Sequence, residues 1–283
     1  MPPPARHAER PYDMRRLSYS STFTEAHRVL SVRAIEWMTG KITLMRLIRR
    51  FEALGPVEGL AFWQRALDIM RIEIRTPPDQ LANIPREGPV VIVANHPHGL
   101  VDGLVMGRLV MQVRRDFKIL TRSLLTGIPE IEYHMVPVPF PHEDDAQAKG
   151  IEMRRQSMAH LADGGVVILF PSGQVAVAET PFGPAVEAEW HPFTAKMVIR
   201  SGATVVPICF PGQNSRLFQI AHHLSYTMRQ GLLLHEITHA IGRPQAPVIG
   251  APVGPDEVGT WASNPRGFMA WLRARTLALA DGA

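Results

Sequence analysis

Residues 89–103, PVVIVANHPHGLVDG, place a short apolar run directly before a loop that holds two histidines, a proline and an aspartate. A short apolar run bounded by turn-forming residues is typical of a strand buried on both faces. Open α/β sheets carry their sites outside the carboxyl ends of the strands, which is where these polar residues stand. The stretch therefore predicts a buried strand and a candidate site at its end.

Four further apolar runs repeat this texture along the chain: FKILT (117–121), HMVPV (134–138), GVVILF (165–170) and TVVPICF (204–210). Helical patterns over 103–114, 147–162 and 193–201 separate them. Strands that alternate with helices predict an α/β fold with a mainly parallel central sheet flanked by helices. Because PSGQ and PGQNS follow two of the runs, three polar loops should meet at one edge of the sheet.

The N-terminal part of the chain has a different pattern. Residues 1–22 are polar and proline-rich, which predicts a flexible arm. Residues 23–74 predict an N-terminal helical segment, broken at Gly40 and at Gly55-Pro56, and residues 75–283 form the predicted α/β domain. Six basic side chains stand between the apolar positions of the first two helices: Arg28, Arg33, Lys41, Arg46, Arg49 and Arg50.

The charge of this segment bears on its partners. Ten of the 30 Lys and Arg residues lie within residues 1–50, against four of the 26 Asp and Glu residues. Such a basic amphipathic segment favours an anionic partner surface, although a solvated helix face has the same pattern. Nucleic acid is a weaker candidate than a membrane for this surface, because the segment has neither interleaved aromatic residues nor a recognised binding motif. We therefore expect no nucleic-acid partner.

Composition limits the class of protein. An apolar content of 46% and a charged content of 20% are those of a globular chain. The single cysteine excludes an internal disulfide and fits a reducing, cytoplasmic compartment. The sequence has no run of about 18 consecutive apolar residues, so we predict no membrane span, and no secretory signal is visible.

The two histidines compete for one role. A histidine beside a carboxylate is the usual pair for taking a proton from a hydroxyl group. His98 and Asp102 would be neighbours on one helix, but Pro97 and Gly99 favour a loop here. Asp102 could also simply cap a helix. From the residues alone, His96 and His98 both stay candidates.

The segment NHPHGLVDG (95–103) resembles the Asn-His-x4-Asp signature of the glycerolipid, or lysophospholipid, acyltransferases of the 1-acylglycerol-3-phosphate acyltransferase type. It has a proline after the histidine and one extra residue before the aspartate. Three later segments resemble further blocks of that family, in the same order: KILTR (118–122), FPSGQVA (170–176) and VVPICFPGQNSRLF (205–218). The resemblance covers roughly residues 75–255 and is greatest to the bacterial hemolysin-like and ornithine-lipid branch.

This resemblance implies an O-acyltransferase of phospholipid or ornithine-lipid synthesis, peripheral on the inner face of the cell membrane. It would move a fatty acyl chain from an acyl carrier protein or coenzyme A thioester to a lysolipid hydroxyl at an anionic membrane surface, without a metal or redox cofactor. His96 would be the general base and Asp102 would orient it. The residues expected to bind substrate are Asn95, Arg122, Pro171, Ser172, Gly173 and Asn214.

The chain departs from the family pattern in the third block. Ser172 stands where the family has a glutamate, and Val175 stands where it has an arginine. Gly173 is kept, so a tight loop could still present backbone N–H groups to an oxyanion or a phosphate. Since an arginine contact to phosphate is lost, a lysolipid or an amino-acid lipid is favoured over glycerol 3-phosphate as acceptor.

Two alternatives stay open. HEITH (235–239) fits the H-E-x-x-H pattern of zinc hydrolases, with Asp256 or Glu257 as a conceivable third ligand. Five glycines and prolines between residues 242 and 252 interrupt the path to these carboxylates, and as part of a helix the segment needs no metal. The chain could also be a non-catalytic lipid-binding protein of the same fold.

Overall fold

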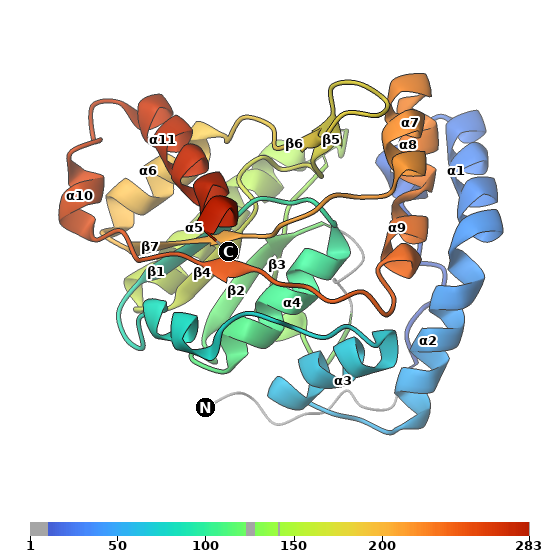
Figure 1. Cartoon of the computed structure of the whole chain (residues 1–283), viewed down its shortest axis with the longest axis horizontal. Helices are drawn as coiled ribbons and strands as arrows, with labels where there is room; N and C mark the ends of the chain where they lie inside the picture. The colour runs from blue at the N-terminus through green and yellow to red at the C-terminus, as the bar shows by residue number, and fades with distance from the viewer. Residues whose placement is uncertain (1–10, 123–127, 141, 283) are drawn as a thin grey trace.

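The computed structural model describes residues 11–122, 128–140 and 142–282. Its main sheet has six strands in the order β3-β2-β4-β1-β7-β8 (Figure 1). All pairs are parallel except β7 with β8. The strands are β1 (Val90–Ala94), β2 (Phe117–Thr121), β3 (Met135–Pro137), β4 (Val166–Leu169), β7 (Thr204–Cys209) and β8 (Val248–Ile249). The predicted α/β class and all five predicted strands are therefore confirmed.

Strand β1 lies between β4 and β7 and is buried along its whole length. Val90 and Ile92 face one apolar core, and Val91 and Val93 face a second core on the other side of the sheet. This alternation is the two-residue period of a strand, and it explains why β1 reads as an uninterrupted apolar run.

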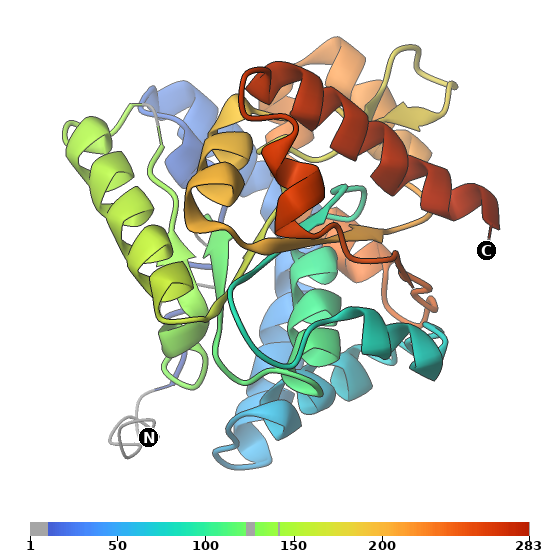
Figure 2. The ribbon, with the colours of Figure 1, turned by 90° about the vertical axis from the view of Figure 1, so that its left-hand side faces the viewer.

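Helices cover both faces of the sheet. Figure 2 shows α6 and α11 on one side and α3 and α4 on the other, as the two apolar cores require. Strands β5 and β6 form a separate antiparallel hairpin. The bounds of these elements are α3 (Leu60–Met70), α4 (Leu100–Met111), α5 (Ala146–Ala162), β5 (Val177–Ala178), β6 (Ala185–Val186), α6 (Pro192–Ser201), α7 (Arg216–Leu224), α8 (Tyr226–Gly231), α9 (Leu233–His239), α10 (Pro255–Gly259) and α11 (Pro265–Leu277). Short 3-10 helices lie at Ser20–Thr22, Pro78–Asn83, Glu132–His134 and Ala278–Gly282.

The N-terminal helices α1 (Ala26–Thr39) and α2 (Lys41–Ala53) run end to end along one side of the molecule, beside α8 and α9 (Figure 1). The predicted break at Gly40 is confirmed. A Cβ at Gly40 would lie 2.7 Å from the backbone carbonyl carbon of Leu234, so only glycine permits this close approach to α9. Leu44 of α2 and Trp63 of α3 enter the core of the α/β domain.

Part of the predicted arm is packed rather than loose. Leu17 is buried in the core, and the Oγ of Ser18 and the backbone N–H of Tyr19 both donate to Glu36, each at 2.6 Å. The Glu36 side chain is fully buried, so it needs such donors, which fixes this stretch against α1. Residues 1–10 lie outside the described residues, and the domain boundaries at residues 22 and 74 remain predictions.

Candidate active site

Two histidines share one buried carboxylate at the end of β1. Gly99 has a φ of +65°, which turns the chain into α4 and places Asp102 in its first turn. The Nδ1 of His96 lies 3.0 Å from Asp102 Oδ2, and the Nδ1 of His98 lies 3.1 Å from Oδ1. The backbone N–H of His98 also donates to Oδ2, at 2.9 Å. One fully buried aspartate therefore accepts three hydrogen bonds.

These contacts decide the protonation of the cluster. Burial raises the pKa of Asp102. The hydrogen bonds and charges of His96 and His98 together lower this pKa by more than burial raises it, so it lies below its ordinary value. The carboxylate is then ionised and can only accept hydrogen bonds. Both imidazoles must donate through Nδ1–H, so Nε2 is the nitrogen of each ring that can exchange a proton with a substrate.

The two imidazoles have different neighbours. The His96 ring stacks on Phe170, with 4.0 Å between the ring centroids. The Nε2 of His98 lies against the loop after β7, where a Cβ at Gly212 would be only 3.0 Å away. Gly212 is therefore a close neighbour of the reactive nitrogen of His98. This proximity favours His96 as the base, which remains a proposal.

Asn95, predicted to bind substrate, joins two strands. Its Nδ2 donates to the carbonyl oxygen of Phe210 at 2.8 Å, and its Oδ1 accepts from the N–H of Phe210 at 2.7 Å. The side chain therefore ties the end of β1 to the residue after β7. This contact holds two of the three predicted loops together.

The loop after β4 lies against the histidines. Ser172 is buried and its hydroxyl donates to the Gln174 carbonyl oxygen at 3.0 Å. The N–H of Gly173 closes a turn on the carbonyl of Phe170, at 3.0 Å, with φ at +66°. The carbonyl of Pro171 accepts from the N–H of His191 at 3.1 Å. Stacking of Phe170 on His96 then brings this loop to the site.

Asn214 and Arg122 differ in placement. The side chain of Asn214 is buried, and its Nδ2 has no hydrogen-bond partner among the described residues, so it is a free donor two residues after Gly212. Arg122 is exposed, and its guanidinium lies 5.3 Å from the Phe140 ring centroid. No contact in the described part of the chain joins Arg122 to the histidine loop.

Glu187 is a site residue that the sequence did not single out. Its carboxylate is buried directly after β6 and accepts the backbone N–H of His96 at 3.1 Å. Its other oxygen accepts the Nε1–H of Trp190 at 3.0 Å. Since 91 positions separate Glu187 from His96 and no motif marks either glutamate of VEAEW, only the fold reveals this contact.

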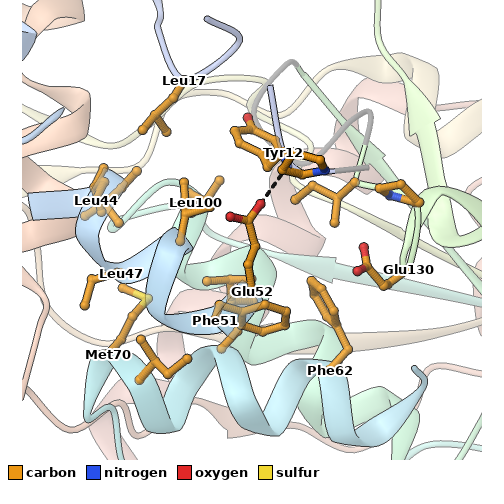
Figure 3. A pocket seen from close by; sticks show the side chains of 18 of the residues that line it. Tyr12, Leu17, Leu44, Leu47, Phe51, Glu52, Phe62, Met70, Leu100 and Glu130 are labelled. Atoms are coloured by element: carbon orange, nitrogen blue, oxygen red, sulfur yellow. Dashed lines mark hydrogen bonds between the residues drawn. The ribbon is translucent and has the colours of Figure 1, made fainter. Parts of the chain in front are cut away.

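An apolar pocket of about 350 Å³ is lined in part by α4, the helix that carries Asp102 (Figure 3). Leu100 and Leu104 of α4 line it, and the rest of the wall comes from α2, α3, α9, residues 11–17, residues 55–56 and residues 128–130. Glu52 and Glu130 are its charged lining residues, and no lysine, arginine or histidine lines it among the described residues. A wall of this kind suits an aliphatic chain and disfavours an anionic group.

HEITH forms part of α9, as the helical interpretation expects. Its glutamate, Glu236, accepts from the backbone N–H of Ser215 at 2.7 Å and from the Ser215 hydroxyl at 2.6 Å. Glu257, the conceivable third ligand, instead forms an ion pair with Arg275, with 3.6 Å between Oε1 of Glu257 and Nη1 of Arg275. Over the described residues, no group of three or more His, Cys, Asp or Glu side chains has metal-binding geometry.

We therefore expect His239→Ala to change neither activity nor zinc content, because the glutamate that a zinc hydrolase would use is committed to holding Ser215. Metal analysis of the purified protein, before and after dialysis against a chelator, measures this directly. One equivalent of zinc that disappears in His239→Ala would support the hydrolase alternative instead.

Comparison with known proteins adds three similarities. The model of the acyltransferase family matches residues 79–211. Lyso-glycine lipid O-acyltransferases of Phocaeicola vulgatus and Bacteroides thetaiotaomicron are 24% and 26% identical to this chain over 163 and 164 residues, in each case 56% of it. The chain spans about half the length of these relatives, 54% and 56%. The crystal structure of the 1-acyl-sn-glycerophosphate (LPA) acyltransferase PlsC from Thermotoga maritima has a TM-score of 0.50 and 16% identity, covering 78% of this chain and 77% of that one, a likeness of fold.

Proposed function

We propose that this chain, whose residues 79–211 match the acyltransferase family, transfers a fatty acyl chain from an acyl carrier protein or coenzyme A thioester to the hydroxyl of a lysolipid. The observation that carries the proposal is an imidazole oriented by a buried carboxylate, on a helix that also lines an apolar pocket. A long-chain thioester needs both, since the base activates the hydroxyl and the pocket takes the hydrocarbon.

In the proposed reaction, the Nε2 of His96 takes the proton of the acceptor hydroxyl as its oxygen attacks the thioester carbonyl carbon. The bond between carbon and sulfur then breaks, and the thiolate leaves and takes up the proton. Asp102 stabilises the imidazolium that forms in between. The unpartnered Nδ2 of Asn214 and the tight turn at Gly173 bind the substrate's oxygen atoms, with Pro171 and Ser172 shaping that turn.

The acceptor that we propose is a lysolipid with an amino-acid headgroup. Ser172 and Val175 replace the glutamate and arginine of the motif that the loop resembles, so this loop offers no cation to a phosphate. The similarity to lyso-glycine lipid O-acyltransferases supports the same choice. Arg122, exposed at the end of β2, is the remaining basic candidate for the headgroup.

The direct test incubates purified protein with acyl carrier protein or coenzyme A thioesters of a long-chain fatty acid and with lyso-glycine lipid or lysophosphatidic acid. We expect mass spectrometry to detect a diacylated product, formed faster from the lyso-glycine lipid. Absence of transfer from either donor to either acceptor would favour the non-catalytic lipid-binding alternative.

We also propose that α1 and α2 hold the protein on the anionic inner face of the cell membrane. Large apolar side chains point outward from them: Leu30, Trp37, Met38 and Ile42 are 69%, 50%, 76% and 45% exposed. No helix in the described part of the chain is long and apolar enough to cross a bilayer. Five of the six basic residues are exposed, but Lys41 is buried near Glu36 and cannot contact headgroups.

A further inference from the structure

The β5–β6 hairpin meets His96 at both of its ends. Ala176, directly before β5, donates its backbone N–H to the carbonyl oxygen of His96 at 2.9 Å. Glu187, directly after β6, accepts the backbone N–H of His96 on Oε2 at 3.1 Å. The two ends of one hairpin thus hold the two backbone polar groups of the same residue.

Glu187 is built into the protein as a buried carboxylate. Its side chain accepts from two neutral donors, the backbone N–H of His96 and the Nε1–H of Trp190. Arg273 of α11 holds the backbone at this point by donating to the carbonyl oxygens of Glu187 and Ala188. Among the described residues, no ion pair neutralises the Glu187 carboxylate.

Burying a carboxylate without a cation is unfavourable unless hydrogen-bond donors satisfy both of its oxygens. A glutamine could not replace it, because one end of the amide only donates and would face a donor. The charge also makes both hydrogen bonds stronger than neutral ones. The side chain therefore fixes the backbone of His96 more firmly than a neutral residue could.

We propose that Glu187 is a positioning residue for acyl transfer, which clamps the His96 backbone so that the imidazole, held by Asp102 and Phe170, faces the acceptor hydroxyl. The inference rests on the proposed function of His96 as general base. Reaction rates are sensitive to such placement, since a misplacement of about 1 Å can cost about 10²-fold in rate.

The test is the set of kinetic constants of Glu187→Gln. We expect kcat to fall by roughly ten- to a hundredfold, while KM stays within about twofold because Glu187 acts on His96 rather than on substrate. Trp190→Phe, which keeps an aromatic ring and removes one donor, should lower kcat less. Glu189→Gln is the matched control, because it removes the same charge from an exposed position two residues away.

A readout that needs no substrate separates this inference from the proposed function. Amide hydrogen exchange at His96 should be faster in Glu187→Gln than in the wild type or in Glu189→Gln. If the wild type transfers no acyl group, the proposed function fails, and faster exchange at His96 still supports the clamp. A Glu187→Gln protein that keeps its kcat, or keeps the exchange rate of His96 while only its melting temperature falls, overturns the inference.

Discussion

His96→Ala should lower the rate of acyl transfer by about 10²–10⁴-fold, the usual cost of removing a general base. The fold should survive, because the ring is half-buried in a loop and contributes one stacking contact and one hydrogen bond. Asp102 keeps its two hydrogen bonds from His98 in this variant, so the buried carboxylate stays solvated by protein groups. Product formation measured well below the melting temperature gives the rate.

His98→Ala is the matched control for that experiment. It removes an imidazole from the same carboxylate but leaves the Nδ1 contact of His96 and the backbone N–H of residue 98 in place. We expect a smaller loss of rate than in His96→Ala, because the Nε2 of His98 faces Gly212. If His98→Ala abolishes transfer and His96→Ala does not, the roles of the two histidines must be exchanged.

Charge reversal at Arg46, Arg49 and Arg50 should weaken binding to anionic vesicles by more than a hundredfold. All three are exposed on α2, and a basic residue near a charged bilayer contributes about 1 kcal/mol, so that three contribute about 3 kcal/mol before the added repulsion of the glutamates. Wild-type binding should also weaken with salt, since surface charges are screened. Vesicle co-sedimentation across a series of anionic lipid contents measures both effects.

The control for this variant reverses Arg86, Arg115 and Arg266, which are exposed outside α1 and α2 and carry the same total charge. It should bind vesicles as the wild type does, and both variants should acylate a short-chain, water-soluble acceptor because the histidine loop is untouched. Equal loss in both variants would mean that binding follows net charge alone. Equal binding of all three proteins to neutral vesicles and to anionic vesicles would leave α1 and α2 only a packing role.

The sequence predicted the sheet well and the site in part. Buried parallel strands need apolar residues on both faces, so each of the five strands, including the run at 90–94, could be predicted from its own residues. The break at Gly40 was predicted because glycine weakens a helix, whereas the close approach of Gly40 to α9 could not be predicted. The helical pattern groups Lys41 with the five exposed arginines of α1 and α2, but Lys41 is buried near Glu36.

The parts that were missed depend on contacts between distant segments. The contact of Glu187 with His96 joins positions that no local pattern relates. The apolar pocket needs walls from α2, α3, α4 and α9, whose relative placement no periodicity encodes. The sharing of Asp102 by two imidazoles also escaped prediction, because sequence spacing presented His96 and His98 as alternatives rather than as partners.

That sharing has a consequence for the charge balance of the reaction. When both imidazoles are in the neutral form that a general base requires, they and the carboxylate carry a single negative charge before the acceptor arrives, and the cluster becomes neutral when His96 takes up the proton. A buried region is thus spared a net positive charge at any stage, which low-polarity surroundings would penalise. Losing the proton to the departing thiolate restores the anion, so each turnover alternates between one negative charge and none at the end of β1.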